Sequence, residues 1–138
     1  MQYPTQGMFD GYSVSLDYPQ PQVGEITTIK YTITKNGKSV QLVSYLSAAM
    51  HIAVVKNDFS WYLHLHGEYH VPGAPLPPLW IKNGQVVHSM AMMVTPDTFM
   101  SPLEAHVIIP SSGLYTIWGQ FKTSSGDLVA TAFTIRVE

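Results

Sequence analysis

Residues 103–137 read LEAHVIIPSSGLYTIWGQFKTSSGDLVATAFTIRV, and this stretch decides the fold class. It contains three runs, 103–109, 114–122 and 128–137, that are rich in Val, Ile, Thr, Tyr and Phe, residues enriched in β-strands. The runs are separated by short segments of Pro, Ser, Gly and Asp, which favour turns. Because short turns join strands that run in opposite directions, the stretch predicts an antiparallel β-sheet.

The sequence before this stretch carries the same pattern. Residues 11–18 and 25–34 alternate between apolar and polar side chains, as half-buried strands do. Asn36-Gly37 predicts a two-residue hairpin turn, since both central residues of that turn need a positive φ. Residues 50–55 and 61–66 give two more strands. About seven strands at this spacing predict an all-β fold, an antiparallel β-sandwich of immunoglobulin-like or cupredoxin-like type.

A chain of 138 residues suits one domain, and we expect residues 1–138 to form a single β-sandwich. Residues 40–49 are the one segment that fits a short helix. Residues 67–101 break the strand pattern, because they are rich in Pro and Met and suggest only one hairpin, around Asn83-Gly84. Long insertions of this kind in compact domains are usually functional or mobile, so we expect a functional arm.

The composition excludes several classes of function. Seven Lys and Arg against nine Asp and Glu give a net charge of −2, which lacks the basic field that nucleic-acid binding needs. The chain has no Cys, which excludes disulfides, thiolate metal sites and blue-copper electron transfer. It contains no Gly-rich phosphate loop, no Gly-x-Ser-x-Gly nucleophile elbow and no Asp-x-Asp calcium pattern. We therefore expect neither an enzyme nor a nucleic-acid partner.

Two histidines share one face of a predicted strand. Successive side chains of a strand point to opposite faces, so His64 and His66 lie on the same face, about 6–7 Å apart. Two imidazoles at that distance can bind one metal ion. If residues 50–55 and 61–66 pair as a hairpin, His51 lies far from the turn and near His66. The pattern allows a three-histidine metal site, but taken alone it favours three surface histidines on a half-exposed strand.

A second group of candidate ligands lies in the arm. Residues 88–93 read HSMAMM and combine imidazole with thioether sulfur, a soft ligand that suits Cu(I). Met also fills irregular gaps in cores, and taken alone this segment favours a buried strand. His70 is a spare ligand close in sequence to His66. His106 is expected on a sheet face, with metal ligation as the less favoured alternative.

Two stretches of the chain resemble the YtkA-like domains, a family of bacterial extracytoplasmic modules. The first, 45–66, holds Tyr-Leu, a run of small residues that ends in His51, an apolar strand and His64-Leu65-His66. The second, 104–121, ends in Gly-Leu-Tyr-Thr-Ile-Trp-Gly-Gln-Phe, similar to the Gly-x-Tyr-x-x-Trp-x-Gln-Phe of members. The resemblance covers roughly residues 40–137.

The resemblance implies an immunoglobulin- or cupredoxin-like domain of the cell envelope, often fused to or encoded near heavy-metal transport components. A periplasmic or extracytoplasmic protein would then carry its signal or anchor outside this sequence. The histidines of the family correspond to His51, His64 and His66. Met50 stands where members commonly have Gly, and Gly67 where they usually have Pro. Met50 would place a thioether beside the first imidazole, which favours copper.

We therefore expect an extracytoplasmic metal-binding domain for copper, as Cu(I) or Cu(II), with zinc as the alternative ion. It would sequester the ion or pass it to a membrane transporter or another envelope protein. The candidates for a fourth ligand beside the three histidines are Met50, His70, His88 and Met90. A homodimer that shares a site at a strand edge is also compatible. The alternative function is an immunoglobulin-like interaction module without metal, whose contact surface is the arm with Trp80.

Overall fold

The computed structural model describes residues 3–73, 79–88 and 95–138 as strands, turns and loops. All strand pairs are antiparallel, which confirms the predicted fold class. The described part contains no helix, and therefore none long and apolar enough to cross a membrane. The strands are β1 (Gln6–Phe9), β2 (Tyr12–Asp17), β3 (Ile26–Lys35), β4 (Lys38–Ser39), β5 (Leu42–Val43), β6 (Met50–Lys56), β7 (Tyr62–Gly67), β8 (Leu79–Lys82), β9 (Gln85–His88), β10 (Leu103–Ile108), β11 (Gly113–Thr123) and β12 (Leu128–Val137).

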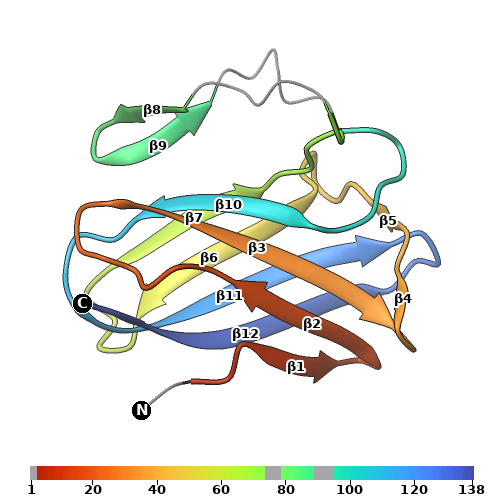
Figure 1. Ribbon diagram of the computed structural model, residues 1–138, viewed down its shortest axis with the longest axis horizontal. Helices are drawn as coiled ribbons and strands as arrows, with labels where there is room; N and C mark the ends of the chain where they lie inside the picture. The colour runs from red at the N-terminus through yellow and green to blue at the C-terminus, as the bar shows by residue number, and fades with distance from the viewer. Residues whose placement is uncertain (1–2, 74–78, 89–94) are drawn as a thin grey trace.

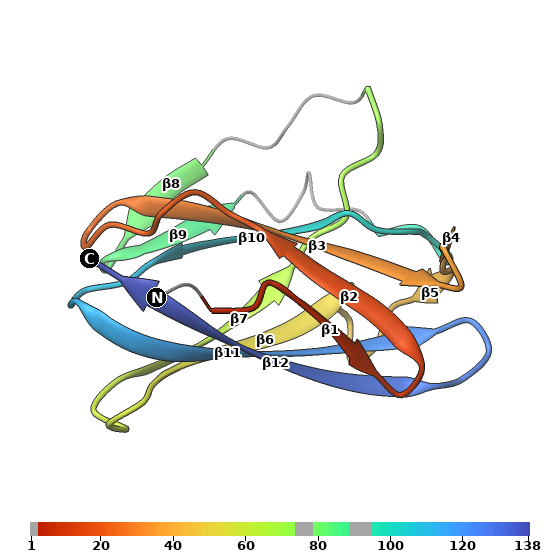
Figure 2. The same ribbon diagram turned by 60° about the horizontal axis from the view of Figure 1, so that its bottom comes forward.

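Two sheets pack face to face as the layers of a sandwich (Figure 1). The first sheet has the order β1-β2-β3-β10, with β4 beside β3, and the second has the order β12-β11-β6-β7, with β5 beside β11. Figure 2 shows the two layers from a second direction. At one side of the sandwich the chain that leaves β7 pairs with β10 through a bridge between Glu68 and Glu104, so the edges of the two sheets meet there.

The sandwich has more strands than the seven expected, because β1, β4 and β5 extend its sheets, and β8 and β9 form a separate two-stranded sheet in the arm. The short helix expected at residues 40–49 is wrong. This segment contains β5 and a bridge between Tyr45 and Ala48. Leu46 and Ser47 have φ values of 49° and 66°, and two consecutive positive φ values are incompatible with a right-handed helix.

In three hairpins, the two central residues of the turn both have positive φ. Asn36-Gly37, at 53° and 76°, joins β3 to β4 as predicted, and Asn83-Gly84, at 52° and 77°, joins β8 to β9. Asp10-Gly11 joins β1 to β2 in the same way, at 52° and 85°. Asn, Asp and Gly tolerate this conformation, so these pairs set the register of the strands they join.

The core lies between the sheets and consists of the side chains that alternate inward from both. Its largest fully buried members are Tyr31, Tyr115, Phe121, Ile29, Ile33, Leu42, Met50, Ile52, Leu103, Ile109, Ile117 and Ile135. Burial of apolar surface at this interface is the main favourable term in folding.

Within the core, Met50 of β6 packs against a glycine on each neighbouring strand. Gly67 of β7 is its register partner, and a Cβ atom placed on Gly67 would lie 3.0 Å from Met50 Cβ. A Cβ atom placed on Gly119 of β11 would overlap Met50 Cε and lie 2.9 Å from Thr131 Oγ1. The two glycines therefore leave the space that the Met50 side chain occupies.

Two buried tyrosines of the core differ in how their hydroxyls are satisfied. Tyr31 Oη is buried without a hydrogen-bond partner among the described residues, and burial raises the pKa of this phenol. The Tyr115 hydroxyl donates to the Ser111 carbonyl oxygen at 2.8 Å and lies 2.9 Å from Ser111 Oγ. The desolvation cost of the Tyr31 hydroxyl is thus not offset by a hydrogen bond, whereas that of the Tyr115 hydroxyl is.

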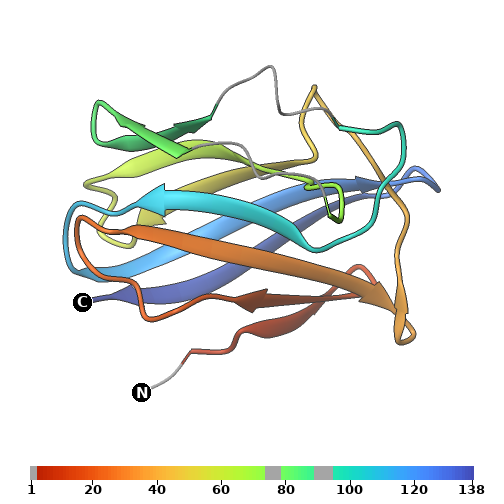
Figure 3. The ribbon, with the colours of Figure 1, turned by 45° about the horizontal axis from the view of Figure 1, so that its top comes forward.

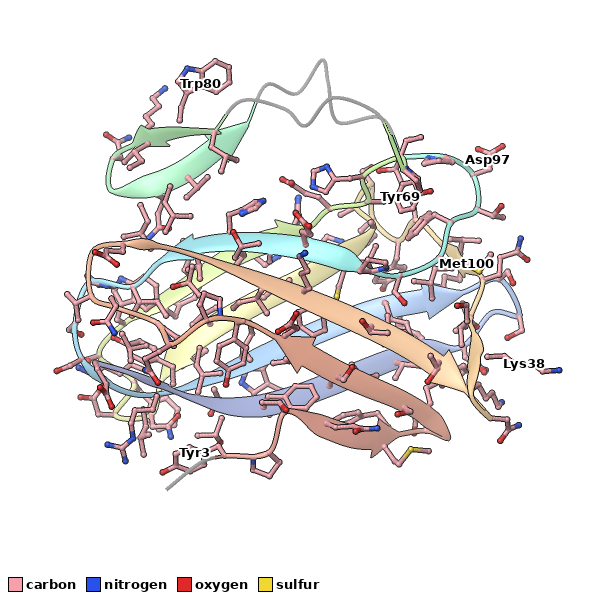
Figure 4. All side chains as sticks on the ribbon, in the orientation of Figure 1. Tyr3, Lys38, Tyr69, Trp80, Asp97 and Met100 are labelled. Carbon is pink, nitrogen blue, oxygen red and sulfur yellow. The ribbon has the colours of Figure 1, made fainter. Side chains whose placement is uncertain are left out.

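The arm carries the β8–β9 hairpin outside the sandwich (Figure 1 and Figure 3). Gln85 holds this hairpin to β10, because its Nε2 donates to the Ile108 carbonyl at 2.7 Å and its Oε1 accepts from the Ile108 N–H at 3.2 Å. Trp80 on β8 points away from the sheets and is half exposed (Figure 4). Within the arm, the β8–β9 hairpin is therefore docked against β10 of the first sheet.

The Gly119→Ala substitution should lower the free energy of unfolding by about 1–3 kcal/mol, because the added methyl group overlaps Met50 in a packed core. Urea unfolding monitored by tryptophan fluorescence measures the change. Lys122→Ala, on the outward-facing side of the same strand, should stay within about 0.5 kcal/mol of the unsubstituted protein. A Gly119→Ala variant as stable as its parent would contradict the packing described here.

The Tyr31→Phe substitution should leave stability unchanged or raise it by up to about 1 kcal/mol, because it removes a buried hydroxyl that lacks a partner. Tyr115→Phe is the matched control and should cost about 0.5–1.5 kcal/mol, since it removes the hydrogen bonds to Ser111. Both are measured by chemical unfolding. A larger loss for Tyr31→Phe than for Tyr115→Phe would contradict this assignment.

Candidate metal centre

The pairing of β6 with β7 brings three imidazoles together on the outer face of the second sheet. His51 is the register partner of His66, and His64 lies opposite Ala53, as the predicted hairpin requires. The ring centroids are 4.9 Å apart for His51 and His66, 5.6 Å for His51 and His64, and 5.3 Å for His64 and His66. One ring nitrogen of each histidine lies within 4.8 Å of the other two. We call this group the histidine triad.

A backbone carbonyl sets the tautomer of one ring. His51 Nε2 lies 2.8 Å from the Tyr45 carbonyl oxygen. Because a carbonyl oxygen only accepts, Nε2 of His51 carries the proton and Nδ1 keeps its lone pair. Metal-binding histidines typically donate their second ring nitrogen to a carbonyl or carboxylate in this way, which fixes the orientation of the ring. Nδ1 is therefore the ring nitrogen of His51 that a metal ion could use.

The environment of His66 favours its neutral form. Burial lowers the pKa of this ring, and the charges of His51 and His64 lower it further. Only a neutral imidazole can bind a metal ion. The pKa shift of His66 therefore acts in the direction of metal binding.

The triad faces solvent beside a shallow apolar depression. Leu46, Trp118 and Ala130 line this depression together with His51 and His64. Leu46 is 70% and Trp118 is 51% exposed, and His64 and His66 are exposed as well. The arrangement can supply three nitrogen ligands and leave a further coordination position for water, another ligand or a partner.

Two of the residues expected as a fourth ligand lie elsewhere. Met50 was expected to place its sulfur beside His51, and this is wrong, because neighbouring residues of a strand point to opposite faces and Met50 is fully buried in the core. His70 does not join the triad either. The chain turns towards β10 after Gly67, and His70 Nε2 lies 3.4 Å from Glu68 Oε2 and 3.6 Å from Glu104 Oε2.

The structure tests neither of the two remaining candidates. His88 is the last residue of β9, but its side chain is outside the described part of the chain. Met90 lies in the segment 89–94, which is also outside the described residues.

A second group of ligands, which we call the Glu-His cluster, lies where the arm leaves the sandwich. It consists of Glu68, His70, Glu104 and His106. One ligand atom each of Glu68, His70 and His106 lies within 4.8 Å of the others. His106 Nε2 is 4.0 Å from Glu68 Oε2 and 3.9 Å from Glu104 Oε2. Their side chains are between 9% and 21% exposed, so the cluster is largely shielded from water.

The sequence contains a signal for this cluster. Glu68-Tyr69-His70 and Glu104-Ala105-His106 are both Glu-x-His, which places the two side chains of each tripeptide on one face of an extended segment. Sequence reasoning placed His106 on a sheet face and left both glutamates out. Burial and the charge of Glu104 raise the pKa of Glu68 to about 7.

Comparisons with known proteins identify the family of this chain. No curated protein and no solved structure matches it. The model of one family, described as a domain of unknown function (DUF8832), matches residues 6–138. Since this match spans nearly the whole chain, the protein belongs to the DUF8832 family.

Proposed function

We propose that this protein is a metal-binding domain that holds a transition-metal ion, copper in the first place and zinc as the alternative, on the histidine triad. The convergence of three ring nitrogens within 4.8 Å of one another carries this proposal. At metal–nitrogen distances of about 2.0–2.1 Å, tetrahedral ligand atoms lie about 3.3–3.5 Å apart. Small movements of the rings would therefore complete the site.

Two features support a built site over three unrelated surface histidines. Adjacent strands of one sheet hold all three residues, so that little backbone freedom is lost when a metal binds. The hydrogen bond from His51 to the Tyr45 carbonyl also fixes one ring in the tautomer that a metal needs. The resemblance of the sequence to YtkA-like domains, a family linked to heavy-metal handling, points in the same direction.

The ligand set favours Cu(II) over Cu(I). Three imidazoles suit both Cu(II) and Zn(II), and the intrinsic affinity of nitrogen sites for divalent ions is higher for copper. Cu(I) would gain most from a thioether, but Met50 is in the core and provides none to this face. Cu(II) is therefore the preferred ion, because nitrogen ligands bind it more tightly than they bind Zn(II).

The exposure of the triad favours transfer of the ion over storage. His64 and His66 are exposed, and Leu46, Tyr62 and Trp118 add exposed apolar surface around the rings. A partner protein could contact this rim while a ligand of its own enters the open coordination position. We propose a periplasmic or other extracytoplasmic location, where a transporter or another envelope protein would receive the ion.

An interaction module without metal is the second candidate function. Its support is β8, where Leu79, Trp80 and Ile81 are 41%, 50% and 62% exposed in succession. Aromatic residues are enriched in protein interfaces. Absence of tight metal binding to the purified protein would favour this function over the first.

The His64→Ala/His66→Ala double variant should bind one Cu(II) fewer than the unsubstituted protein, with at least about a hundredfold loss of affinity at the triad, since one imidazole cannot hold the ion alone. A competition titration with a chromophoric chelator gives both numbers. Met50→Leu is the matched control and should bind copper normally, because the sulfur lies on the opposite face of the sheet. Unchanged stoichiometry and affinity in the double variant would refute the proposed site.

Copper affinity should fall by more than about tenfold between pH 7 and pH 5, because protons compete with the metal for each imidazole. In the metal-free protein the ring of His66 should titrate below pH 6.5, since burial and neighbouring charge lower its pKa. His51→Ala removes one of those charges and should move this midpoint upward. NMR titration of the ring protons measures it, and a midpoint at or above 6.5 in the unsubstituted protein would contradict the expected shift.

A further inference from the structure

We propose that the Glu-His cluster is a second metal site, separate from the histidine triad, which binds Zn(II) through Glu68, His70 and His106 with Glu104 as the fourth ligand. This inference does not depend on the proposed function. The triad lies on the outer face of the second sheet, whereas Glu104 and His106 project outward from β10 of the first sheet.

The backbone fixes the two glutamates opposite each other. The Glu68 N–H donates to the Glu104 carbonyl at 2.7 Å, and the Glu104 N–H donates to the Glu68 carbonyl at 2.9 Å. Like charges placed directly opposite each other across a strand pair are destabilising. Lys30 Nζ, on a half-exposed side chain, lies 3.8 Å from Glu104 Oε1 and offsets part of this repulsion. A divalent cation between the carboxylates would offset it for both.

The distances within the cluster suit a tetrahedral ion. The imidazole nitrogens of His70 and His106 lie 3.4–4.0 Å from the Oε2 atoms of Glu68 and Glu104. Ligand atoms around Zn(II) lie about 3.3–3.5 Å apart. Each of the four nitrogen–oxygen distances would therefore have to shorten by about 0.5 Å or less to reach this range. Side-chain rotation alone can supply such a contraction.

Both imidazoles are arranged to offer Nε2 to an ion. His106 Nδ1 lies 2.9 Å from Thr28 Oγ1, its neighbour on β3, and this contact orients the ring with Nε2 towards the glutamates. His70 Nε2 is buried and forms no hydrogen bond to any described residue, although two carboxylates lie within 3.6 Å. His70 Nε2 thus lies near both carboxylates but is not oriented to donate a hydrogen bond to either. This arrangement fits ligands that surround one cation better than a nitrogen hydrogen-bonded to a carboxylate.

The ligand chemistry of the cluster fits Zn(II) and disfavours Cu(I). Two imidazoles with carboxylates are a ligand set of the kind that binds Zn(II), and the cluster contains no soft sulfur ligand for Cu(I). His70 and Glu104 also line a pocket that Tyr69, Phe99 and Met100 complete, which gives an ion a path to the cluster. Tyr69 and Met100 are labelled near the base of the arm in Figure 4. Zn(II) bound here would cross-link the start of the arm to β10.

The test uses the full chain with His64→Ala/His66→Ala, so that the triad does not contribute. We expect this variant to retain one tight Zn(II) per chain in a competition titration, and Co(II) in its place to give the intense visible bands of a tetrahedral site. Adding His70→Ala/His106→Ala should weaken binding by at least about a hundredfold. Glu68→Gln, which preserves shape, should weaken it by at least about tenfold.

Thr28 provides a separate test of the ring orientation. Thr28→Val should weaken Zn(II) binding by about 10–100-fold and Thr28→Ser should restore it, as expected for a hydrogen bond that positions a ligand. Zn(II) should also raise the melting temperature of the His64→Ala/His66→Ala variant in a concentration-dependent way, but not after loss of His70 and His106. Far-ultraviolet circular dichroism checks that each variant is folded.

Two results would overturn the proposal. One is equal Zn(II) affinity in the His64→Ala/His66→Ala variant and in the variant that also lacks His70 and His106. The other is a folded Glu68→Gln variant that binds Zn(II) as its parent does. Failure of copper binding at the triad would leave this proposal intact, because each experiment on the cluster is made without the triad.

Discussion

The register of β6 between β7 and β11 is the constraint on which both faces of the second sheet depend. Met50 fills the space left by Gly67 and Gly119, and its neighbour His51 therefore points outward, opposite His66. A shift of one residue would turn every side chain of the strand to the other face, bury an imidazole and expose the methionine. The same packing that stabilises the core thus assembles the triad.

Much of this arrangement follows from local pattern. Alternation in 50–55 and 61–66 suffices to place His51, His64 and His66 on one face, because both the period of a strand and a short hairpin are local rules. The same rule excludes Met50 from the site, and the sequence-based expectation was wrong there because it treated neighbours in the chain as neighbours in space. Similarly, residues 40–49 were the one segment whose apolar spacing fits a short helix, although the positive φ values within it depend on tertiary context.

The Glu-His cluster could not be predicted in the same way. Each Glu-x-His tripeptide is visible in the sequence, but their meeting depends on a non-local event, the departure of the chain from the second sheet after Gly67 and its pairing with β10. Nothing near residue 68 specifies the strand against which it will pair, because that choice is made by how the two sheet edges meet. Without this information, His70 was one of the candidates for a fourth ligand beside the triad.

The two proposed sites differ in the features that govern how readily an ion leaves. The triad is open, entirely of nitrogen ligands and rimmed by exposed apolar side chains, so an incoming ligand can reach its ion directly. The Glu-His cluster is shielded, contains carboxylates and is held by two backbone hydrogen bonds, so release of an ion would leave Glu68 to take up a proton or to face Glu104 as a like charge. An ion in the cluster would therefore stabilise the junction between arm and sandwich, whereas an ion on the triad would remain available for exchange.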